Sequence, residues 1–364
     1  MDILVGLQYG DEGKGKITDL LSRSYDVVAR FQGGNNAGHT IFKNGNKVVL
    51  NLIPSGIVAD TPLNLLGQGM VIDPVHLKYE IENLIGVVEN PIERIFISDH
   101  AHLITPKHIE EDKKENAHIG TTMKGIGPAY RDKTYRKGYR VDDIFGEKIY
   151  NEFRDYPEFI EALEFMKNLN IVDSMWLVEM EHLGKKILAE GAQGTMLDIE
   201  HGTYPYVTCS NTISSYAPIG LGMNPRSIDK VFGVTKSYTT RVGTGDLPTE
   251  IDSELSDKLQ KLGNEFGATT GRMRSCSWLN LDELKYSIYL NGVSELIITK
   301  LDILSDMPVI QIYNNEEYID FEPWETNDMS DKRFADFIEY IETNTNTKVS
   351  IASISPDRTG VIYF

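Results

Sequence analysis

The chain has 364 residues, of which 41% are hydrophobic and 9% aromatic, so the composition supports a sizeable core and excludes a wholly disordered protein. A formal net charge of −18 argues against a protein that coats nucleic acid or anionic membranes, because such binding depends on cationic surface. The cysteines, Cys209 and Cys276, lack metal-ligand spacing, which argues against a disulfide framework or a cysteine zinc site. With no basic leader and no apolar run of about 18 residues, we expect a soluble protein of the reducing cytoplasm.

Strand-like apolar runs alternate with helical patterns along the whole chain. The predicted strands are, in chain order, 2–7, 26–30, 48–52, 94–97, 186–189, 230–235, 295–299, 309–312 and 349–352. Helical spacing begins at 17–21 and recurs at 76–84 and 333–340. This alternation is typical of an α/β protein with a largely parallel central sheet and helices on both faces. We expect one domain over residues 1–364, with a helical insertion at about 142–183 and an acidic, looped stretch at 313–331.

A glycine-rich motif, GDEGKGK at residues 10–16, follows the first predicted strand. Its spacing matches a phosphate-binding loop, although Ile17 stands where such a loop carries the Ser or Thr that binds Mg²⁺. Glycines let backbone N–H groups turn toward an anion, which the next helix N-terminus also attracts. Asp11 puts a carboxylate into this anion site, which is costly unless it binds Mg²⁺ or takes up a proton during catalysis. An ordinary glycine-rich turn with surface lysines is the alternative.

A second motif, GGNNAGHT at residues 33–40, places polar side chains on a turn that allows close approach of a ligand. These side chains belong to Asn36, His39 and Thr40. A lone histidine is more often a packed structural residue than a catalyst. Here Gly38 and Thr40 flank the ring, which favours the reading of His39 as a general acid near neutral pH.

Two further loops are cationic, which is unusual in so acidic a chain. Residues 124–140 hold six Lys or Arg residues against one acid, Asp132, and indicate an anionic ligand such as a nucleotide phosphate. The segment ATTGRMR at 268–274 combines two arginines with hydroxyl groups, which suits bidentate capture of a small dicarboxylate. A solvated basic face and an exposed loop are the respective alternatives.

Two loops suit the recognition of a purine base. Gln193, in EGAQGT directly after a predicted strand, could read a base edge with its amide, although an ordinary turn is equally compatible with the pattern. In TKLD at 299–302, Asp302 can accept both N1–H and N2–H of guanine while the Lys300 stem lies over the base. Adenine offers no such pair of donors, so this motif favours guanine.

Taken together and in this order, the motifs resemble those of the adenylosuccinate synthetase family over nearly the whole chain. The shared motifs are GDEGKGK, GGNNAGHT, IGTTMKGIGPAY, EGAQGTMLDI, HGTYPYVT, TTGR and TKLD. The resemblance implies a ligase of purine biosynthesis that joins L-aspartate to C6 of IMP. GTP would be cleaved through a 6-phosphoryl intermediate, giving adenylosuccinate, GDP and phosphate. A GTPase-like sheet, a Mg²⁺ cofactor and a homodimer are implied as well, with no nucleic-acid or membrane partner.

The resemblance also implies a role for individual residues. Asp11 would be the base that removes the purine N1 proton, and His39 the acid that faces the γ-phosphoryl group. Mg²⁺ would be bound by Asp11 and the Gly38 carbonyl. The other expected contacts are, for the nucleotide monophosphate, Asn36, Thr122, Gln193, Thr208 and, across the dimer, Arg136; for aspartate, Thr270, Arg272 and Arg274; and for GTP, Gly13, Lys14, Gly15, Thr40, Lys300, Asp302 and Ser355.

The chain departs from the family pattern at several positions. Two of four basic residues of the aspartate loop are replaced in GRMRS, the segment Ser214–Tyr216 replaces Ala-Gly-Gly, GDLPTE replaces GPFPTE, and Ser355 replaces a glycine. These changes concern substrate identity and not reaction type. The alternative is a phage-type enzyme that uses dGMP, aspartate and ATP or GTP to make a 2-aminoadenine precursor; IMP ranks first. A GTP-dependent switch is more remote, because it would need neither Asp11 with His39 nor the aspartate-type arginines.

Overall fold

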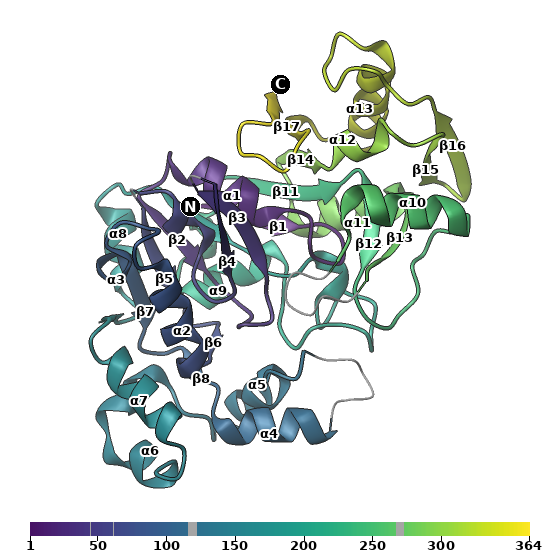
Figure 1. Cartoon of the computed structure of the whole chain (residues 1–364). Helices are drawn as coiled ribbons and strands as arrows, with labels where there is room; N and C mark the ends of the chain where they lie inside the picture. The colour runs from purple at the N-terminus through teal and green to yellow at the C-terminus, as the bar shows by residue number, and fades with distance from the viewer. Residues whose placement is uncertain (44, 61, 116–121, 267–272) are drawn as a thin grey trace.

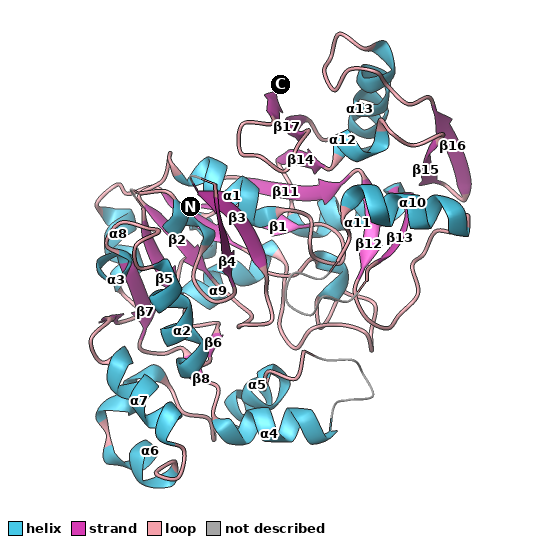
Figure 2. Cartoon of the chain, viewed as in Figure 1, coloured by secondary structure: helices cyan, strands magenta, loops and turns pink. Residues whose placement is uncertain are grey.

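A computed structural model describes residues 1–43, 45–60, 62–115, 122–266 and 273–364. Within them, the centre of the fold is a ten-stranded sheet in the order β18-β17-β14-β11-β1-β10-β2-β5-β7-β9 (Figures 1 and 2). Each neighbouring pair is parallel except β17 and β18. The strands are β1 (Asp2–Gly6), β2 (Val27–Arg30), β5 (Leu63–Leu66), β7 (Ile95–Ser98), β9 (Asn170–Val172), β10 (Ile187–Glu190), β11 (Val231–Lys236), β14 (Glu295–Thr299), β17 (Val349–Ser353) and β18 (Val361–Tyr363).

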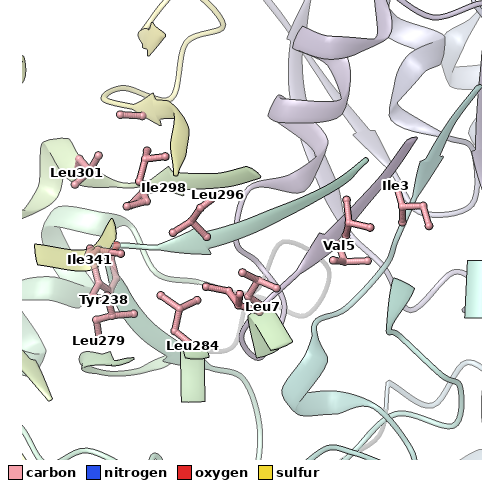
Figure 3. Close-up of a cluster of buried hydrophobic side chains, with 14 of the residues drawn as sticks. Ile3, Val5, Leu7, Tyr238, Leu279, Leu284, Leu296, Ile298, Leu301 and Ile341 are labelled. Carbon is pink, nitrogen blue, oxygen red and sulfur yellow. The ribbon is translucent and has the colours of Figure 1, made fainter. Parts of the chain in front are cut away.

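Both faces of this sheet are buried, which explains why its strands read as continuous apolar runs. On β1, Ile3 and Val5 join one hydrophobic cluster, whereas Leu4 joins another that also contains Ile17 of helix α1 (Lys14–Ser22). Figure 3 shows the first cluster, where side chains of β1 and β14 meet those of the helices α11 (Leu281–Asn291) and α13 (Lys332–Thr345). The central strands are therefore fixed between two cores.

Among the residues that the structure describes, three smaller sheets flank the centre. They are β12 (Tyr238–Arg241), β13 (Ser275–Asn280), β15 (Ile310–Asn314) and β16 (Glu317–Phe321); the hairpin β3 (His39–Lys43) and β4 (Asn46–Leu50); and the pair β6 (Val71–Ile72) and β8 (His102–Leu103). The other helices are α2 (Pro74–Leu84), α3 (Pro91–Arg94), α4 (Pro106–Glu115), α5 (Ile126–Tyr135), α6 (Glu147–Glu152), α7 (Pro157–Met166), α8 (Trp176–His182), α9 (Ala217–Leu221), α10 (Ser253–Gly263) and α12 (Leu301–Leu304). None of the helices in the described ranges is long and apolar enough to cross a membrane.

The predicted α/β fold with a largely parallel sheet is confirmed. Each predicted strand and each predicted helix has an observed counterpart, but those at 48–52 and 309–312 lie in flanking sheets as β4 and β15. Strand β5 was not predicted because Asn64 interrupts its apolar run; the Asn64 amide is buried and donates to the Pro62 carbonyl.

Two predictions about irregular segments were wrong in part. The stretch 313–331 is not simply looped, because β15 and β16 form an antiparallel hairpin in which Tyr313 pairs with Tyr318. Acidic side chains of β16 point to solvent, and this masked its strand pattern. The segment 142–183 is largely helical, but it also contributes β9, which pairs with β7 at the edge of the central sheet.

Candidate active site

The loops of four motifs follow the carboxyl ends of parallel strands near the middle of the sheet, where β1, β10 and β2 are neighbours and β14 is separated from β1 by β11. Strand β1 leads into residues 10–16, β2 into 33–40, β10 into 191–195 and β14 into 300–302. In open parallel sheets, ligands bind in the crevice at these strand ends. The sheet order therefore gathers motifs that lie nearly 300 residues apart in sequence.

Two glycines of the phosphate loop pack against residues of other motifs, Gly15 against His39 and Gly13 against Thr299. A Cβ atom at Gly15 would lie 2.8 Å from Cβ of His39, so a larger residue would push the histidine away. Gly13 has a φ of 88° and sits beside Thr299, whose Oγ1 donates to the Glu12 carbonyl at 2.7 Å. Glycine at position 13 gives helix α1 its left-handed cap.

Glu12 organises the phosphate loop from inside and was missed by the sequence reasoning. Its side chain is fully buried and accepts hydrogen bonds from the amides of Gln8 at 3.1 Å and Gly10 at 2.9 Å. The Lys14 ammonium pairs with this carboxylate and donates to the Gln193 carbonyl. Lys14 is thus held at the loop by a carboxylate and a carbonyl oxygen, groups with which a phosphate would compete.

His39 is oriented by a buried carboxylate. Its Nδ1 lies 2.7 Å from Oε1 of Glu190 and 2.9 Å from Oγ of Ser55. Ser55 also donates to Glu190 through its amide, at 2.7 Å, and its hydroxyl, at 2.5 Å. Burial raises the pKa of Glu190, but His39, Ser55 and the buried Arg30 together bring it below its ordinary value. With Nδ1 engaged, Nε2 is the ring nitrogen that can act on a ligand.

Arg274 bridges Asp11 and another buried carboxylate. Its Nε donates to Oδ2 of Asp11 at 2.7 Å, and its Nη1 donates to Oε2 of Glu265 at 2.5 Å. Asp11 itself has a φ of 60° and retains 29% of its side-chain exposure. The carboxylate expected to act as base and an arginine expected to bind aspartate are therefore in direct contact.

Three of the residues expected to bind the monophosphate have contacts in the site: Asn36 with Thr208, and Gln193 with Gly10 of the phosphate loop. Nδ2 of Asn36 donates to Oγ1 of Thr208 at 3.3 Å. Gln193 has a φ of 55°, and its Oε1 is buried without a hydrogen-bond partner among the described residues. A buried acceptor of this kind is suited to an N–H group of a ligand. Thr122 is half-buried, two residues before Lys124, whose ammonium donates to the Asn35 carbonyl at 2.6 Å.

The expected guanine site is tied to the same framework. Lys300 caps α12 with a φ of 65°, and its Nζ donates to the Gly263 carbonyl at 2.7 Å. Burial raises the pKa of Asp302, and the nearby positive charges of Lys300 and Lys16 offset only part of this increase. Nζ of Lys16 donates to the Ser355 carbonyl at 2.7 Å, which fastens the loop containing Ser355 to helix α1.

Other expected residues lie at the edge of this assembly. Gly38 and Thr40 flank His39 at the start of β3 and are half-buried. Arg136 is the C-cap of α5, has a φ of 60° and is exposed to solvent. Its side chain could therefore reach a ligand bound to a second subunit. Thr270 and Arg272 lie outside the described residues.

A family model, related sequences and a solved structure all show similarity of this chain to adenylosuccinate synthetases. The family model for adenylosuccinate synthetase matches residues 3–330. Adenylosuccinate synthetases of Christiangramia forsetii and Flavobacterium psychrophilum are each 42% identical, over 98% of this chain and 98% of theirs. The structure of fully ligated adenylosuccinate synthetase from Plasmodium falciparum has a TM-score of 0.93 and 32% identity, over 100% of this chain and 99% of that one.

A phage enzyme shares the fold at greater distance. The succinoaminodeoxyadenylate synthetase of cyanophage S-2L, solved with dGMP and with dATP as energy donor, has a TM-score of 0.73. It is 23% identical over 100% of this chain and 94% of that chain. Identity this low shows a common fold alone.

Proposed function

The chain belongs to the adenylosuccinate synthetase family and is thus a C–N ligase that joins L-aspartate to IMP with cleavage of GTP; we propose the residue roles below. The observation that supports them best is the placement of two ionisable side chains around one phosphate loop. Asp11 lies within the loop, and His39 packs against Gly15 of the same loop. A base and an acid on one phosphate site suit phosphoryl transfer to an oxygen that must first be activated.

In the first step, Asp11 accepts the N1 proton of IMP. The electron pair left behind is delocalised onto O6, which then attacks the γ-phosphorus of GTP. His39, oriented through Nδ1 by Glu190, donates a hydrogen bond from Nε2 to the transferring group and stabilises the charge that develops there. GDP leaves, and O6 carries the phosphoryl group.

In the second step, the amine of aspartate attacks C6. The C6–O6 bond breaks and phosphate departs with the bonding electron pair, which restores the aromatic ring, and the attacking nitrogen loses a proton to solvent. Arg274 binds a carboxylate of aspartate, together with Thr270 and Arg272 as further proposed contacts. Binding aspartate in this way holds its amine close to the activated carbon.

Mg²⁺ fits the oxygen groups around the phosphate loop. Mg²⁺ takes few protein ligands and completes its shell with water and phosphate oxygens, so the half-exposed Asp11 carboxylate and the Gly38 carbonyl are a sufficient protein contribution. Bound there, the ion would neutralise charge on the β- and γ-phosphates.

The nucleotide contacts follow from the same frame. For the monophosphate we propose Asn36, Thr122, Gln193 and Thr208, with Arg136 contributed by the second subunit of a homodimer. The exposed, helix-ending position of Arg136 supports this assignment. For GTP we propose Gly13, Lys14, Gly15 and Thr40 at the phosphates, and Lys300, Asp302 and Ser355 at the base. The proposed compartment is the cytoplasm.

The experiment that tests these roles measures phosphate release by the purified protein. With GTP and Mg²⁺ present, release should require both IMP and aspartate. Asp11→Asn should abolish turnover without unfolding the protein, because asparagine tolerates the positive φ at this position better than alanine does. Substantial turnover by a folded Asp11→Asn variant would remove Asp11 from the role of base.

A further inference from the structure

We propose that Glu265 is a positioning residue that holds Arg274 for aspartate and Lys300 for the guanine base in fixed relation to each other. The inference deepens the proposed function and rests on it. Nothing in the sequence motifs pointed to Glu265, which precedes ATTGR and is separated from TKLD by more than thirty residues.

The Glu265 carboxylate is the centre of a buried cluster. It is fully buried, and Oε1 and Oε2 each lie 3.1 Å from Nζ of Lys236. Nη1 of Arg274 donates to Oε2 at 2.5 Å, and the Tyr238 hydroxyl donates to Oε1 at 2.6 Å. Nζ of Lys300 lies 3.8 Å from Oε1. One carboxylate thus faces three cations, two of which are proposed to bind different substrates.

The chain connects this cluster to both substrate sites. Glu265 lies two residues beyond the end of α10 and three residues before the ATTGRMR segment that carries the aspartate loop. Its carbonyl also accepts from the Arg274 amide at 3.0 Å. From the other side, Lys300 donates to the carbonyl of Gly263, the last residue of α10. The segment 263–265 is therefore held by the guanine-reading lysine and in turn holds the aspartate-binding arginine.

The charges explain why Glu265 is needed. Lys236, Arg274 and Lys300 supply three positive charges, and Glu265 and Asp11 two negative ones. An incoming aspartate brings a carboxylate that can replace Asp11 on the Nε side of Arg274 and so free Asp11 for its own role. The hydrogen bond from Nη1 of Arg274 to Glu265 is retained throughout. It keeps the guanidinium from moving with either Asp11 or the bound aspartate. A buried arginine without this carboxylate would be poorly oriented and repelled by Lys236.

The test is the kinetic behaviour of Glu265→Gln, which keeps size and hydrogen-bonding capacity but removes the charge. We expect KM for aspartate to rise about 10- to 100-fold and KM for GTP to rise by a smaller factor. KM for IMP should stay within about 2-fold, because none of the described partners of Glu265 is a proposed IMP contact. A merely structural role would instead change all three KM values together or lower only the amount of active protein.

A double-mutant cycle makes the test specific. If Glu265 acts through Arg274, then Glu265→Gln should add little to the aspartate KM of Arg274→Lys, whereas independent effects would multiply. Tyr238→Phe is the matched control, because it removes one hydrogen bond from Glu265 and leaves the cation contacts intact. It should lower thermal stability while leaving KM for aspartate within about 2-fold.

The outcomes separate this inference from the proposed function. Wild-type protein that releases phosphate without needing aspartate would overturn both. Aspartate-dependent wild-type turnover combined with an unchanged aspartate KM in Glu265→Gln, or with multiplicative effects in the cycle, would overturn the inference alone. If Glu265→Gln does not fold, Glu265→Asp is judged by the same criteria, since it retains the charge on a shorter arm that reaches Arg274 less well.

Discussion

The Nδ1 atom of His39 lies 2.7 Å from Oε1 of Glu190, a fully buried carboxylate at the carboxyl end of β10. A carboxylate in this position fixes the tautomer and orientation of the ring. The contact joins a loop after β2 to the end of β10, the neighbouring strand in the sheet. The orientation of His39, the acid proposed for phosphoryl transfer, therefore depends on the order of strands in the sheet as well as on the residues of its own motif.

Glu190→Gln should lower kcat about 100-fold and change the KM values much less, since the ring would lose its orientation but no substrate contact. Steady-state phosphate release measures kcat and the three KM values. Glu295→Gln, which removes a carboxylate from a surface ion pair with Lys230, is the matched control. Wild-type kcat in Glu190→Gln would contradict the role.

Asp302→Asn should change the purine preference of the triphosphate site. In the proposed role the carboxylate accepts from N1–H and N2–H of guanine, whereas an amide can donate to the C2 oxygen of xanthine. We expect kcat/KM for GTP to fall about 100-fold or more and that for XTP to rise, because a site built to hydrogen-bond one base rejects a base that leaves its polar groups unpaired. Equal use of GTP by wild-type and variant protein would remove Asp302 from base recognition.

Arg136→Leu should raise KM for the monophosphate and should be rescued by a second inactive variant if Arg136 acts across a dimer. In mixed dimers of Arg136→Leu and Asp11→Asn, one site receives Arg136 and Asp11 from different subunits and is intact. Random mixing should restore about a quarter of wild-type activity, because half of the dimers are mixed and each has one good site. Activity that stays at the level of the separate variants in verified heterodimers would contradict the shared site.

The half-buried Glu283 should make stability depend on pH. Burial raises its pKa from 4.5 to about 7, although the Tyr9 hydroxyl, which donates to it at 2.8 Å, and Arg241 act the other way. The folded state thus holds this proton more tightly than the unfolded chain does, and its contribution is lost as pH rises from 4.5 through 7. The loss amounts to about 3 kcal/mol at most.

Glu283→Gln stays neutral and can still accept from Tyr9, so it should lack this loss. The free energy of unfolding, measured in urea at pH 5 and pH 8, should fall more in wild type than in the variant. The exposed Glu322→Gln should behave as wild type. Identical pH dependence in wild type and Glu283→Gln would show that the carboxyl is ionised in both states.

Much of the fold could be predicted because a parallel strand that is buried on both faces has a continuous apolar sequence. Strand β5 was not predicted because the burial of the Asn64 amide depends on its tertiary partners. Strand β16 was not predicted because its acidic sequence hides the pairing with β15. The prediction of a single domain stays a prediction. The motifs at 10–16, 33–40, 190–195 and 299–302 could be located on the fold because each lies at or just after the end of a strand that the sequence predicts.

The supporting carboxylates could not be predicted in the same way. Glu12, Glu190 and Glu265 are three of 54 acidic residues, and each is fully buried. Glu12 is bound by neighbours within its own loop, whereas the partners of Glu190 and Glu265 come from other elements of the fold. For these two residues, the sequence alone does not show which cations and amides the fold brings to them. A glutamate directly after an apolar strand, as at position 190, is the one signal that could have been used.

The most direct test of the central claim is a product assay that crosses two acceptors, IMP and dGMP, with two donors, GTP and ATP, in the presence and absence of aspartate. The account predicts adenylosuccinate from IMP and GTP, with one phosphate released per product and none without aspartate. Turnover with dGMP but not IMP, or hydrolysis of GTP that is indifferent to aspartate and IMP, would contradict it.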